Sequence, residues 1–258
     1  KALAAADNYK ADSSKYTPPN YGYSGLKYVK ATDNFNRSKI PGNGANPVIT
    51  VPQFWTKNFP NGIKMIGTQN NEIPTVTVSV SIPGGHLLQA KDTAKIGLAD
   101  MFAAMMNEDT KNYSAEQMAV ELQKLGSNVN IGSGTDDITF TVSSLKKNLD
   151  ATLKLLEERM FNPLFTADAF KRNQKQALEG LKQQKGQAAA VASEVIAKVN
   201  FGKDHILGMS ENGTEHTIKN MKLEDVQAYY NNYLTSKGAK VVVVGDITQA
   251  EILPKLAF

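Results

Sequence analysis

The alternation of apolar and polar residues predicts several strands that each have one buried face. Residues 76–82 alternate valine or isoleucine with threonine or serine, and residues 137–142 alternate similarly after a Ser-Gly-Thr turn. This turn predicts a hairpin of two antiparallel strands. The unbroken valine run 241–244 predicts a strand that is central and buried. Strands are expected over 63–68, 76–82, 128–134, 136–143 and 241–246.

Apolar residues that recur three or four positions apart predict helices in the rest of the domain. Ser114 and Gln117 form a capping-box pattern at the start of one helix, and Gly126 ends it. Asn148 and Thr166 are expected to cap two later helices. Helices are expected within 94–106, 114–125, 148–160, 166–181, 188–199, 223–234 and from 248 onward, with a loop over 202–220.

The order of these elements predicts the fold class. Strands of one sheet that are separated by blocks of helices indicate an α+β domain, here over residues 51–258. We expect a two-layer sandwich in which a mostly antiparallel sheet has its helices packed on one face.

Residues 1–50 differ in composition from this domain, because they are rich in Pro, Gly, Asn and Ser. Such a segment cannot bury enough apolar area to offset the entropy lost on ordering. We interpret it as an extended linker or strap that lies on another surface, with plain disorder as the alternative. Its expected contact residues are Tyr16, Tyr21, Tyr23, Tyr28 and Phe35.

The bulk composition limits the class of protein. Of the 258 residues, 41% are hydrophobic and 21% are charged, which is ordinary for a globular domain with a sizeable core. The formal net charge of +4 is too small to indicate nucleic-acid binding. The absence of cysteine excludes disulfides and thiolate metal sites, but it leaves the compartment open. No apolar run approaches the ~20 residues of a membrane-spanning helix.

One stretch of the sequence resembles a known family. Gly97-Leu98-Ala99 is followed by five residues, then by Met105, a polar break and a helix that ends in Leu125-Gly126. This order is similar to the zinc-binding segment of the insulinase/pitrilysin/mitochondrial processing peptidase family of inverted-zincin metallopeptidases. The resemblance covers roughly residues 55–250. Its closing part rests on Gly213-Thr214, Ile218, Glu224-Asp225, Tyr229, Tyr230, Tyr233 and Gly245-Asp246-Ile247.

The resemblance implies that the zinc site of this family is absent here. In active members the five residues read H-x-x-E-H, in which the two histidines bind zinc and the glutamate acts as general base. In this chain they read Asp100-Met101-Phe102-Ala103-Ala104. Alanine neither binds a metal nor transfers a proton. We therefore predict no catalytic and no metal-binding residue in this segment, and we expect the zinc in a partner half.

The other candidate ligands do not restore such a site. The family's third ligand is a glutamate on a later helix, and Glu179 lies 75 positions after Ala104. We expect Glu179 to be a solvated or salt-bridged helix residue; the alternative is that it holds a weakly bound hard cation together with Asp100. The three histidines, none of which lies four positions from another, are expected to be exposed in loops. They are His86, His205 and His216.

The resemblance also implies a role in proteolysis without catalysis by this segment. Family enzymes pair a zinc-bearing half with a degenerate half, in one chain or as two subunits, around an unfolded peptide. We expect a non-catalytic domain that forms part of this chamber and of the partner interface, with an exposed sheet edge as a surface for extended peptide. Its partners are then the H-x-x-E-H half and a peptide substrate, for which no binding residue is assigned.

Two alternatives remain open. One is a non-enzymatic scaffold subunit derived from the family, and the other is a metal-dependent hydrolase built on Asp100, Glu108 and Glu179. Because the chain does not begin with Met and stops at Phe258, we expect it to be a piece of a longer protein. Large bacterial members of the family suggest a periplasmic or cell-envelope location.

Overall fold

The computed structural model describes residues 19–30, 32, 34–36, 38–40, 42–48 and 51–258. The chain separates into two compact units, Lys1–Ile49 and Thr50–Phe258. In the described part of the first unit, Tyr21 and Tyr23 stack with ring centroids 5.6 Å apart. Both side chains are exposed, as are those of Tyr28 and Phe35. Tyr16 lies outside the described residues.

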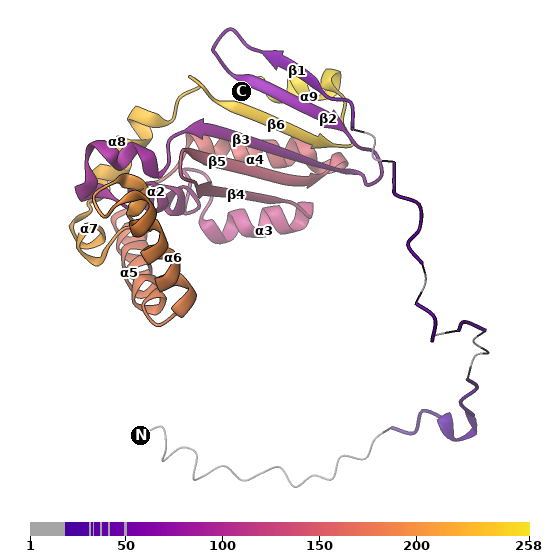
Figure 1. The fold of residues 1–258 in the computed structure, drawn as a ribbon. Helices are drawn as coiled ribbons and strands as arrows, with labels where there is room; N and C mark the ends of the chain where they lie inside the picture. Colours follow the sequence, from indigo (N-terminus) through magenta and orange to yellow (C-terminus); the bar gives the residue numbers. More distant parts are fainter. Residues whose placement is uncertain (1–18, 31, 33, 37, 41, 49–50) are drawn as a thin grey trace. The chain divides into compact units, whose positions relative to one another are not determined.

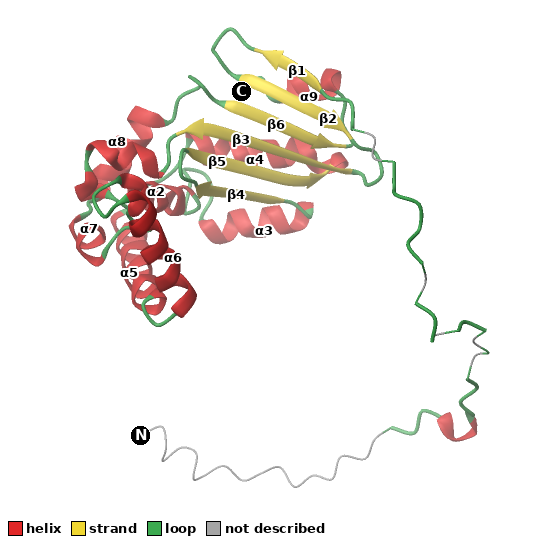
Figure 2. Ribbon diagram, viewed as in Figure 1, coloured by secondary structure: helices red, strands yellow, loops and turns green. Residues whose placement is uncertain are grey.

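Strands and helices alternate along the second unit in the predicted order (Figures 1 and 2). The strands are β1 (Trp55–Asn58), β2 (Lys64–Gln69), β3 (Thr75–Pro83), β4 (Asn128–Ser133), β5 (Asp137–Leu145) and β6 (Lys240–Gly245). The α-helices are α2 (Leu98–Met106), α3 (Ala115–Leu125), α4 (Leu149–Phe161), α5 (Ala167–Gln184), α6 (Ala188–Phe201), α7 (Glu215–Asn220), α8 (Leu223–Tyr233) and α9 (Gln249–Lys255). Short 3₁₀ helices are η1 (Tyr23–Gly25), η2 (His86–Lys91), η3 (Thr93–Lys95), η4 (Lys146–Asn148) and η5 (Ile206–Gly208).

The six strands form one sheet in the order β1-β2-β6-β3-β5-β4. All neighbouring pairs are antiparallel except β2 and β6, which run parallel. Helices α3, α4 and α9 cover one face of the sheet, and α2, α5, α6, α7 and α8 gather beyond the end at which β3 finishes (Figure 1). The predicted α+β sandwich, mostly antiparallel with helices on one face, is thus confirmed.

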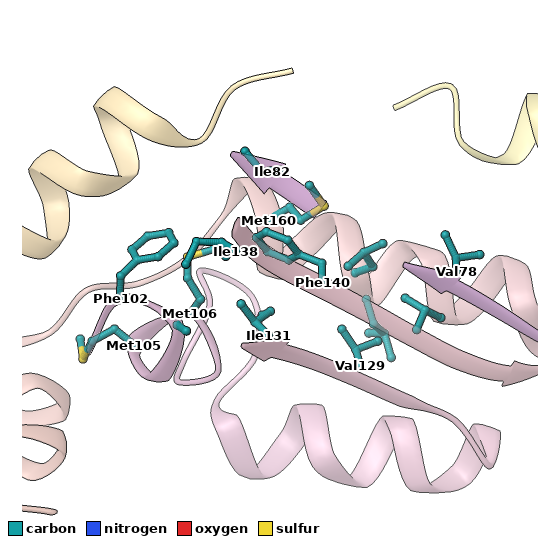
Figure 3. Close-up of a cluster of buried hydrophobic side chains, with 14 of the residues drawn as sticks. Val78, Ile82, Phe102, Met105, Met106, Val129, Ile131, Ile138, Phe140 and Met160 are labelled. Carbon is teal, nitrogen blue, oxygen red and sulfur yellow. The ribbon is translucent and has the colours of Figure 1, made fainter. Parts of the chain in front are cut away.

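The hydrophobic core lies between the sheet and its helices. Val78 of β3, Phe140 of β5 and Phe102 of α2 are each at most 1% exposed (Figure 3). Because side chains alternate between the faces of a strand, the same strands point most of their serine and threonine side chains away from this core; Ser144 of β5 is the buried exception and bonds to Thr152 of α4. α2 contributes Met105 and Met106, which fill the space between the sheet end and α5.

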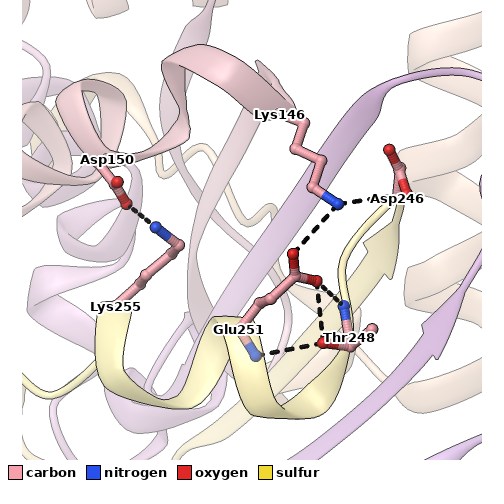
Figure 4. Close-up of polar contacts among 6 residues, drawn as sticks. All are labelled: Lys146, Asp150, Asp246, Thr248, Glu251 and Lys255. Carbon is pink, nitrogen blue, oxygen red and sulfur yellow. Dashed lines mark hydrogen bonds and ion pairs between the residues drawn. The ribbon is translucent and has the colours of Figure 1, made fainter.

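The last helix is held by a group of charged contacts on the covered face (Figure 4). Thr248 accepts a hydrogen bond from the backbone N–H of Glu251, and the Glu251 carboxylate accepts one from the Thr248 N–H in return. Lys146 Nζ lies 3.3 Å from Glu251 and 3.5 Å from Asp246. The predicted start of α9 at Thr248 is therefore confirmed, with a capping box that the sequence pattern allows.

Several local predictions are confirmed and others need correction. Ser114 and Gln117 form the capping box of α3, and Thr166 caps α5. Asn148 lies at the N-cap of α4 as predicted, but its side chain makes no capping hydrogen bond, because the amide donates instead to the Leu125 carbonyl at 2.7 Å. The expected loop 202–220 contains the additional helix α7, and a short edge strand, β1, precedes the first predicted strand.

The valine run is central, as predicted, but it is buried on one face only. Val241 and Val243 are at most 6% exposed, whereas Val242 and Val244 are 42% and 41% exposed. In the part of the chain that the structure describes, no helix covers the opposite face of the sheet (Figure 2). No described helix is both long enough and apolar enough to cross a lipid bilayer.

Candidate functional site

The first turn of α2 is held by close contact with the segment around the start of α7. Gly97, at the N-cap of α2, has φ of 93°, a conformation that favours glycine. A Cβ at this position would lie 2.8 Å from Ile218 Cδ1 and 3.0 Å from the Asn212 carbonyl oxygen. Asp100 follows in the first turn, where the helix dipole favours a negative charge. A glycine at this position therefore lets α2 begin in close contact with the segment 212–218.

A pocket of about 350 Å³ lies between α2 and α5, and we call it the α2–α5 groove. Asp100 and Ala104, one helical turn apart on α2, form one wall. Gln176 and Gly180, one turn apart on α5, lie on the other wall. Asn212 borders the groove from the loop before α7. The groove therefore contains the two positions at which the family's histidines are expected.

Glu179 does not face this groove. Its carboxylate is exposed and lies 3.9 Å from Lys175 Nζ on the same helix. The expectation of a salt-bridged surface residue is thus confirmed, and the residue of α5 that faces Asp100 and Ala104 is Gly180. A Cβ added to Gly180 would meet open space.

This arrangement does not fit zinc. A catalytic zinc site needs three protein ligands and an open position for water. Asp100 is a single oxygen ligand, and neither Ala104 nor Gly180 carries a donor atom. The described residues contain no group of three His, Cys, Asp or Glu side chains placed to hold a metal ion. The three carboxylates of the hydrolase alternative, which include Glu108 and Glu179, are therefore not brought together.

Asp100 is a partly buried carboxylate without a cationic partner among the described residues. It accepts a hydrogen bond from the Ser133 hydroxyl at the end of β4. Burial raises the pKa of Asp100, the Ser133 hydrogen bond opposes this change, and the negative charge of Glu211 adds to it. The nearby His86 ring lowers the pKa. The folded protein therefore favours the protonated form of the Asp100 carboxyl group.

His86 is buried, which corrects the expectation of an exposed loop histidine. The residue is 2% exposed, and its Nε2 lies 2.8 Å from the Ile206 carbonyl oxygen. The backbone N–H of His86 donates to Gly134 at 3.1 Å, and the preceding Gly85 N–H donates to the Tyr229 hydroxyl at 3.0 Å. His86 Nδ1 has no hydrogen-bond partner among the described residues. Since Nε2 must carry a proton to donate to a carbonyl, Nδ1 is an unpaired acceptor in the neutral ring and an unpaired donor in the charged ring.

The other two histidines are exposed, as expected. His205 Nδ1 accepts from the Leu207 N–H at 3.2 Å and so caps η5. His216 lies on α7 and not in a loop, where its ring contacts the side chain of Asn220. Glu108, after α2, is held by Arg172 and by Asn173, whose Nδ2 donates to it at 2.7 Å. The side chains of His205, His216 and Glu108 thus bond to neighbouring groups of the protein itself.

The edge of the sheet at β4 is closed by side chains. Asn107 Nδ2 donates to the Ile131 carbonyl at 2.8 Å, and the Ile131 N–H donates to Asn107 Oδ1 at 3.3 Å. Arg159 Nη1 donates to the Val129 carbonyl at 2.6 Å and to Asn107 Oδ1 at 3.0 Å. The Asn107 amide thus takes the place that the peptide group of an added strand would occupy. An extended peptide cannot pair with Ile131 unless Asn107 moves.

The uncovered face of the sheet has a small apolar area. Ile66, Val242 and Val244 are 39–42% exposed, and Ile66 lies beside Val242 in the register of β2 and β6. Across β6, Ser79 and Thr77 of β3 oppose these two valines. The apolar area of this face is therefore limited to Ile66, Val242 and Val244: the exposed Lys64 and Lys240 lie at its edge, and the face becomes hydroxyl-rich toward β3.

A family model for the insulinase family (peptidase family M16) matches residues 64–207, which is more than half of the chain. The chain belongs to this family, as the resemblance predicted. The matched region includes α2, the β4–β5 hairpin and α5. It therefore contains both helices that form the walls of the groove. The chain is therefore a family member that keeps the fold around the zinc site but lacks the H-x-x-E-H residues.

The similar proteins include one described as a non-peptidase and one described as a peptidase subunit. The chain is 26% identical over 194 residues to the non-peptidase homolog YmxG of Helicobacter pylori, covering 75% of this chain and 44% of that protein. It is 21% identical over 211 residues to a probable mitochondrial-processing peptidase subunit beta of Arabidopsis thaliana, covering 82% and 39%. The crystal structure of a peptidase M16 inactive domain from Pseudomonas fluorescens superimposes with a TM-score of 0.73 at 23% identity, covering 80% of this chain and 49% of that one. The chain spans less than half the length of each of these three.

The sequence did not indicate the roles of four residues in and around this site. At α5 the acidic Glu179 stands beside Gly180 and is the more obvious candidate ligand, and the partner of His86, Ile206, is 120 positions away in the chain. Asn107 and Arg159 carry no motif; their pairing with the β4 backbone depends on the packing of α2 and α4. A helical wheel of α5 would have placed Gln176 and Gly180 on one face, which is the signal that could have identified Gly180.

Proposed function

We propose that the chain is a non-catalytic half-domain of an M16 zinc metallopeptidase, where it forms part of the peptide-enclosing chamber and of the interface with the H-x-x-E-H half. The observation that carries this proposal is the α2–α5 groove. Helix α2, the β4–β5 hairpin and helix α5 are all retained. Ala104 and Gly180, which line the groove between the two helices, have no side-chain atom that could bind a metal. Zinc and the general base are then supplied by the partner half.

The uncovered face of the sheet supports a partner interface. Ile66, Val242 and Val244 form an exposed apolar area on an otherwise hydroxyl-rich face. More than half of the length of each of these relatives lies outside the matched part, so a further domain is available to cover this face. Burying these side chains would be favourable by roughly 25 cal/mol for each Å² of apolar surface removed from water. We therefore assign this face to the partner or to the following domain.

The closed edge at β4 limits the surfaces of this domain that an extended peptide could contact. An extended peptide was expected to bind to a sheet edge, but Asn107 already pairs with Ile131 at the edge nearest the groove. Peptide confinement by this half then depends on the groove and on the surface around it, and not on strand addition to β4. The linker role of residues 1–50 stays part of the proposal.

A non-enzymatic scaffold subunit is the second candidate. The observation that favours it is the similarity to a Helicobacter pylori protein described as a non-peptidase homolog. Both candidates require a degenerate groove and a partner interface. They differ in whether the assembly cleaves peptides.

Co-purification with the H-x-x-E-H half of the same organism tests the proposal. We expect a stable complex by light scattering, and cleavage of a fluorogenic unstructured peptide only when both halves are present. Val242→Lys should weaken the complex, because it places a charge in the apolar area of the uncovered face. Val199→Lys is the matched control, since Val199 is 79% exposed on α6. A complex without peptidase activity would favour the scaffold, and no association would contradict both candidates.

A further inference from the structure

Helix α6 has an apolar composition but no buried residue. Its sequence, AAAVASEVIAKVNF, consists mostly of alanine, valine and other apolar residues. None of these residues is buried, and Val195 and Ile196 are 52% and 59% exposed. Helices in proteins are stabilised mainly by burying an apolar face, so an apolar helix that buries nothing indicates a surface that binds another group.

A cavity of about 990 Å³ lies between α5 and α6, and we call it the α5–α6 groove. The two helices are consecutive in the chain and lie side by side (Figure 1). Each wall includes one face of its helix, because the lining residues recur three or four positions apart. They include Leu178, Leu181, Lys182 and Lys185 on α5 and Ala190, Glu194, Ala197 and Phe201 on α6. The segment 207–217 borders the groove on a third side.

The dimensions and the lining of this groove fit an extended peptide. From Ala190 to Phe201 the α6 wall is about 16 Å long at the rise of an α-helix. About five residues of extended chain cover this length. Leu178, Leu181 and Leu207 offer further apolar contacts along it. The groove therefore accommodates several apolar side chains of one peptide segment.

The end of the groove at the turn between α5 and α6 carries an excess of positive charge. Lys185 lies 4.0 Å from Glu215, and neither Lys182 nor Lys185 forms another ion pair among the described residues. The pKa of Glu215 is lowered by three lysines, first by the hydrogen bond and charge of Lys219 and then by the charges of Lys185 and Lys182. Three lysines thus share one carboxylate at this end of the groove.

The other carboxylates of the groove do not offset this excess. Glu194 forms an ion pair with Lys198, one turn along α6. Glu211 lies at the β4–β5 hairpin, where the Thr135 hydroxyl donates to it at 2.6 Å. The first turn of α6 contains no acidic residue and has no side-chain cap, so its free N–H groups add to the positive potential. The turn end of the groove is therefore complementary to a negatively charged group.

We propose that the α5–α6 groove binds an extended apolar segment of a peptide, with a carboxylate of this peptide placed beside Lys182 and Lys185. The apolar side chains of the segment lie between the leucines of α5 and the alanines and Phe201 of α6. The groove shares Leu181 and Asn212 with the α2–α5 groove, so the bound segment lies next to the positions of the lost metal ligands. This site deepens the proposed function, on which it rests, because it gives the non-catalytic half a direct contact with the enclosed peptide.

The test measures the affinity of the purified chain for labelled peptides by fluorescence anisotropy. The first peptide has about five residues of leucine and alanine, a neutral dye at its amino terminus and a free carboxylate at its end. The second ends in an amide, the third adds a glutamate before this amide, and the fourth replaces the leucines of the first by serine. We expect the first to bind at least about 10-fold more tightly than the serine peptide, because the serine peptide buries less apolar surface. It should bind about threefold more tightly than the amidated peptide, since an exposed ion pair contributes little. Equal affinity of the first and third peptides identifies a side-chain carboxylate as an equivalent source of the charge.

Two variants with matched controls locate the site. Ala197→Trp places a large side chain in the middle of the α6 wall and should weaken binding of the first peptide about 10-fold or more. Val199→Trp is its control, because Val199 is 79% exposed on the same helix and does not line the groove, and the affinity should change by less than about twofold. The double variant Lys182→Gln and Lys185→Gln should bind the carboxylate and amidated peptides equally. Lys175→Gln removes an exposed lysine of α5 outside the groove and should preserve the difference between these peptides.

Equal affinity for the leucine and serine peptides would overturn the proposal, and so would an Ala197→Trp variant that binds like Val199→Trp. The same holds if the lysine double variant still prefers the carboxylate peptide, or if no peptide binds. A dimer in solution that Ala197→Trp dissociates would assign the groove to a second copy of the chain instead. Failure of the proposed function is distinguishable. If the chain associates with the H-x-x-E-H half but binds no peptide in this groove, the peptide site falls and the proposed function stands. Peptide binding without this association would leave the site in place and contradict the chamber role.

Discussion

The two sides of α2 have been shaped by different requirements. The side that is buried in the core carries Phe102, Met105 and Met106, each at most 1% exposed. The other side carries Asp100 and Ala104, which line the open α2–α5 groove. The first side holds the domain together through apolar burial, while the second contributes little to packing. The difference explains how a family member can lose its metal ligands and keep its fold, since the ligand positions lie on the side that the core does not use.

The largest expected effect is on the packed side. Phe102→Ala should lower the free energy of unfolding by about 3–5 kcal/mol, because it removes a fully buried ring and leaves a cavity. Ala104→Ser, two residues along on the groove side, should change it by less than about 0.5 kcal/mol. Urea denaturation followed by circular dichroism measures both values. Similar losses for the two variants would contradict the contrast between the sides.

A smaller loss is expected where α2 and α4 close the β4 edge. Asn107→Ala removes the side chain that pairs with Ile131 and accepts from Arg159. Leaving these partly buried groups without partners should cost about 1–3 kcal/mol. Asn107→Asp keeps the acceptor toward Arg159 and should lose less. If Asn107→Ala is neutral by the same denaturation assay, the closed edge is not a stabilising contact.

Gly180→Ala tests whether the α5 wall of the groove is as loosely packed as the groove side of α2. Glycine within a helix is less stable than alanine by roughly 0.5–1 kcal/mol. The added Cβ meets open space, so the variant should gain about this amount in free energy of unfolding. Gly97→Ala is the matched contrast, since φ of 93° and a neighbour at 2.8 Å make it destabilising. A loss of stability in Gly180→Ala would show that α5 packs against α2 more closely than the structure indicates.

The smallest effect concerns the charge of Asp100. Burial raises the pKa of Asp100 in the folded state, so the fold favours the protonated carboxyl group. The stability that this group contributes is present below its unfolded-state pKa and is lost as the pH rises through the higher folded-state pKa. Asp100→Asn should therefore be more stable than the wild type at pH 7, and the two should converge in acid. Thermal unfolding from pH 3 to pH 8 checks this trend, and a wild type that is more stable at pH 7 would contradict it.

Local signals in the sequence predicted most of the fold. The Ser114–Gln117 capping box, the alternation in β3 and β5 and the order of elements are properties of short stretches, and each was confirmed. The valine run could not reveal that one of its faces is uncovered, because the same pattern occurs in strands buried on both faces. Whether a face of the sheet is covered depends on the face against which the helices pack, and this is a property of the tertiary structure.

The site was predictable only in part. The missing H-x-x-E-H residues are visible in five consecutive positions, but the facing residue on α5 is not. One position along a helix changes the direction of a side chain by about 100°, so spacing alone could not separate Glu179 from Gly180. The burial of His86 depends on Ile206, a contact between distant parts of the chain that no local pattern encodes.

The most direct test of the central claim is the zinc content of the purified chain after dialysis against micromolar zinc. It should be compared with that of a variant that combines Asp100→His, Ala104→His and Gly180→Glu, which places three ligands around the α2–α5 groove. We predict almost no zinc in the wild type, about one zinc per chain in this variant, and little in the variant without Gly180→Glu. About one zinc per wild-type chain would contradict the account, because the groove would then not be the vacated metal site of the family.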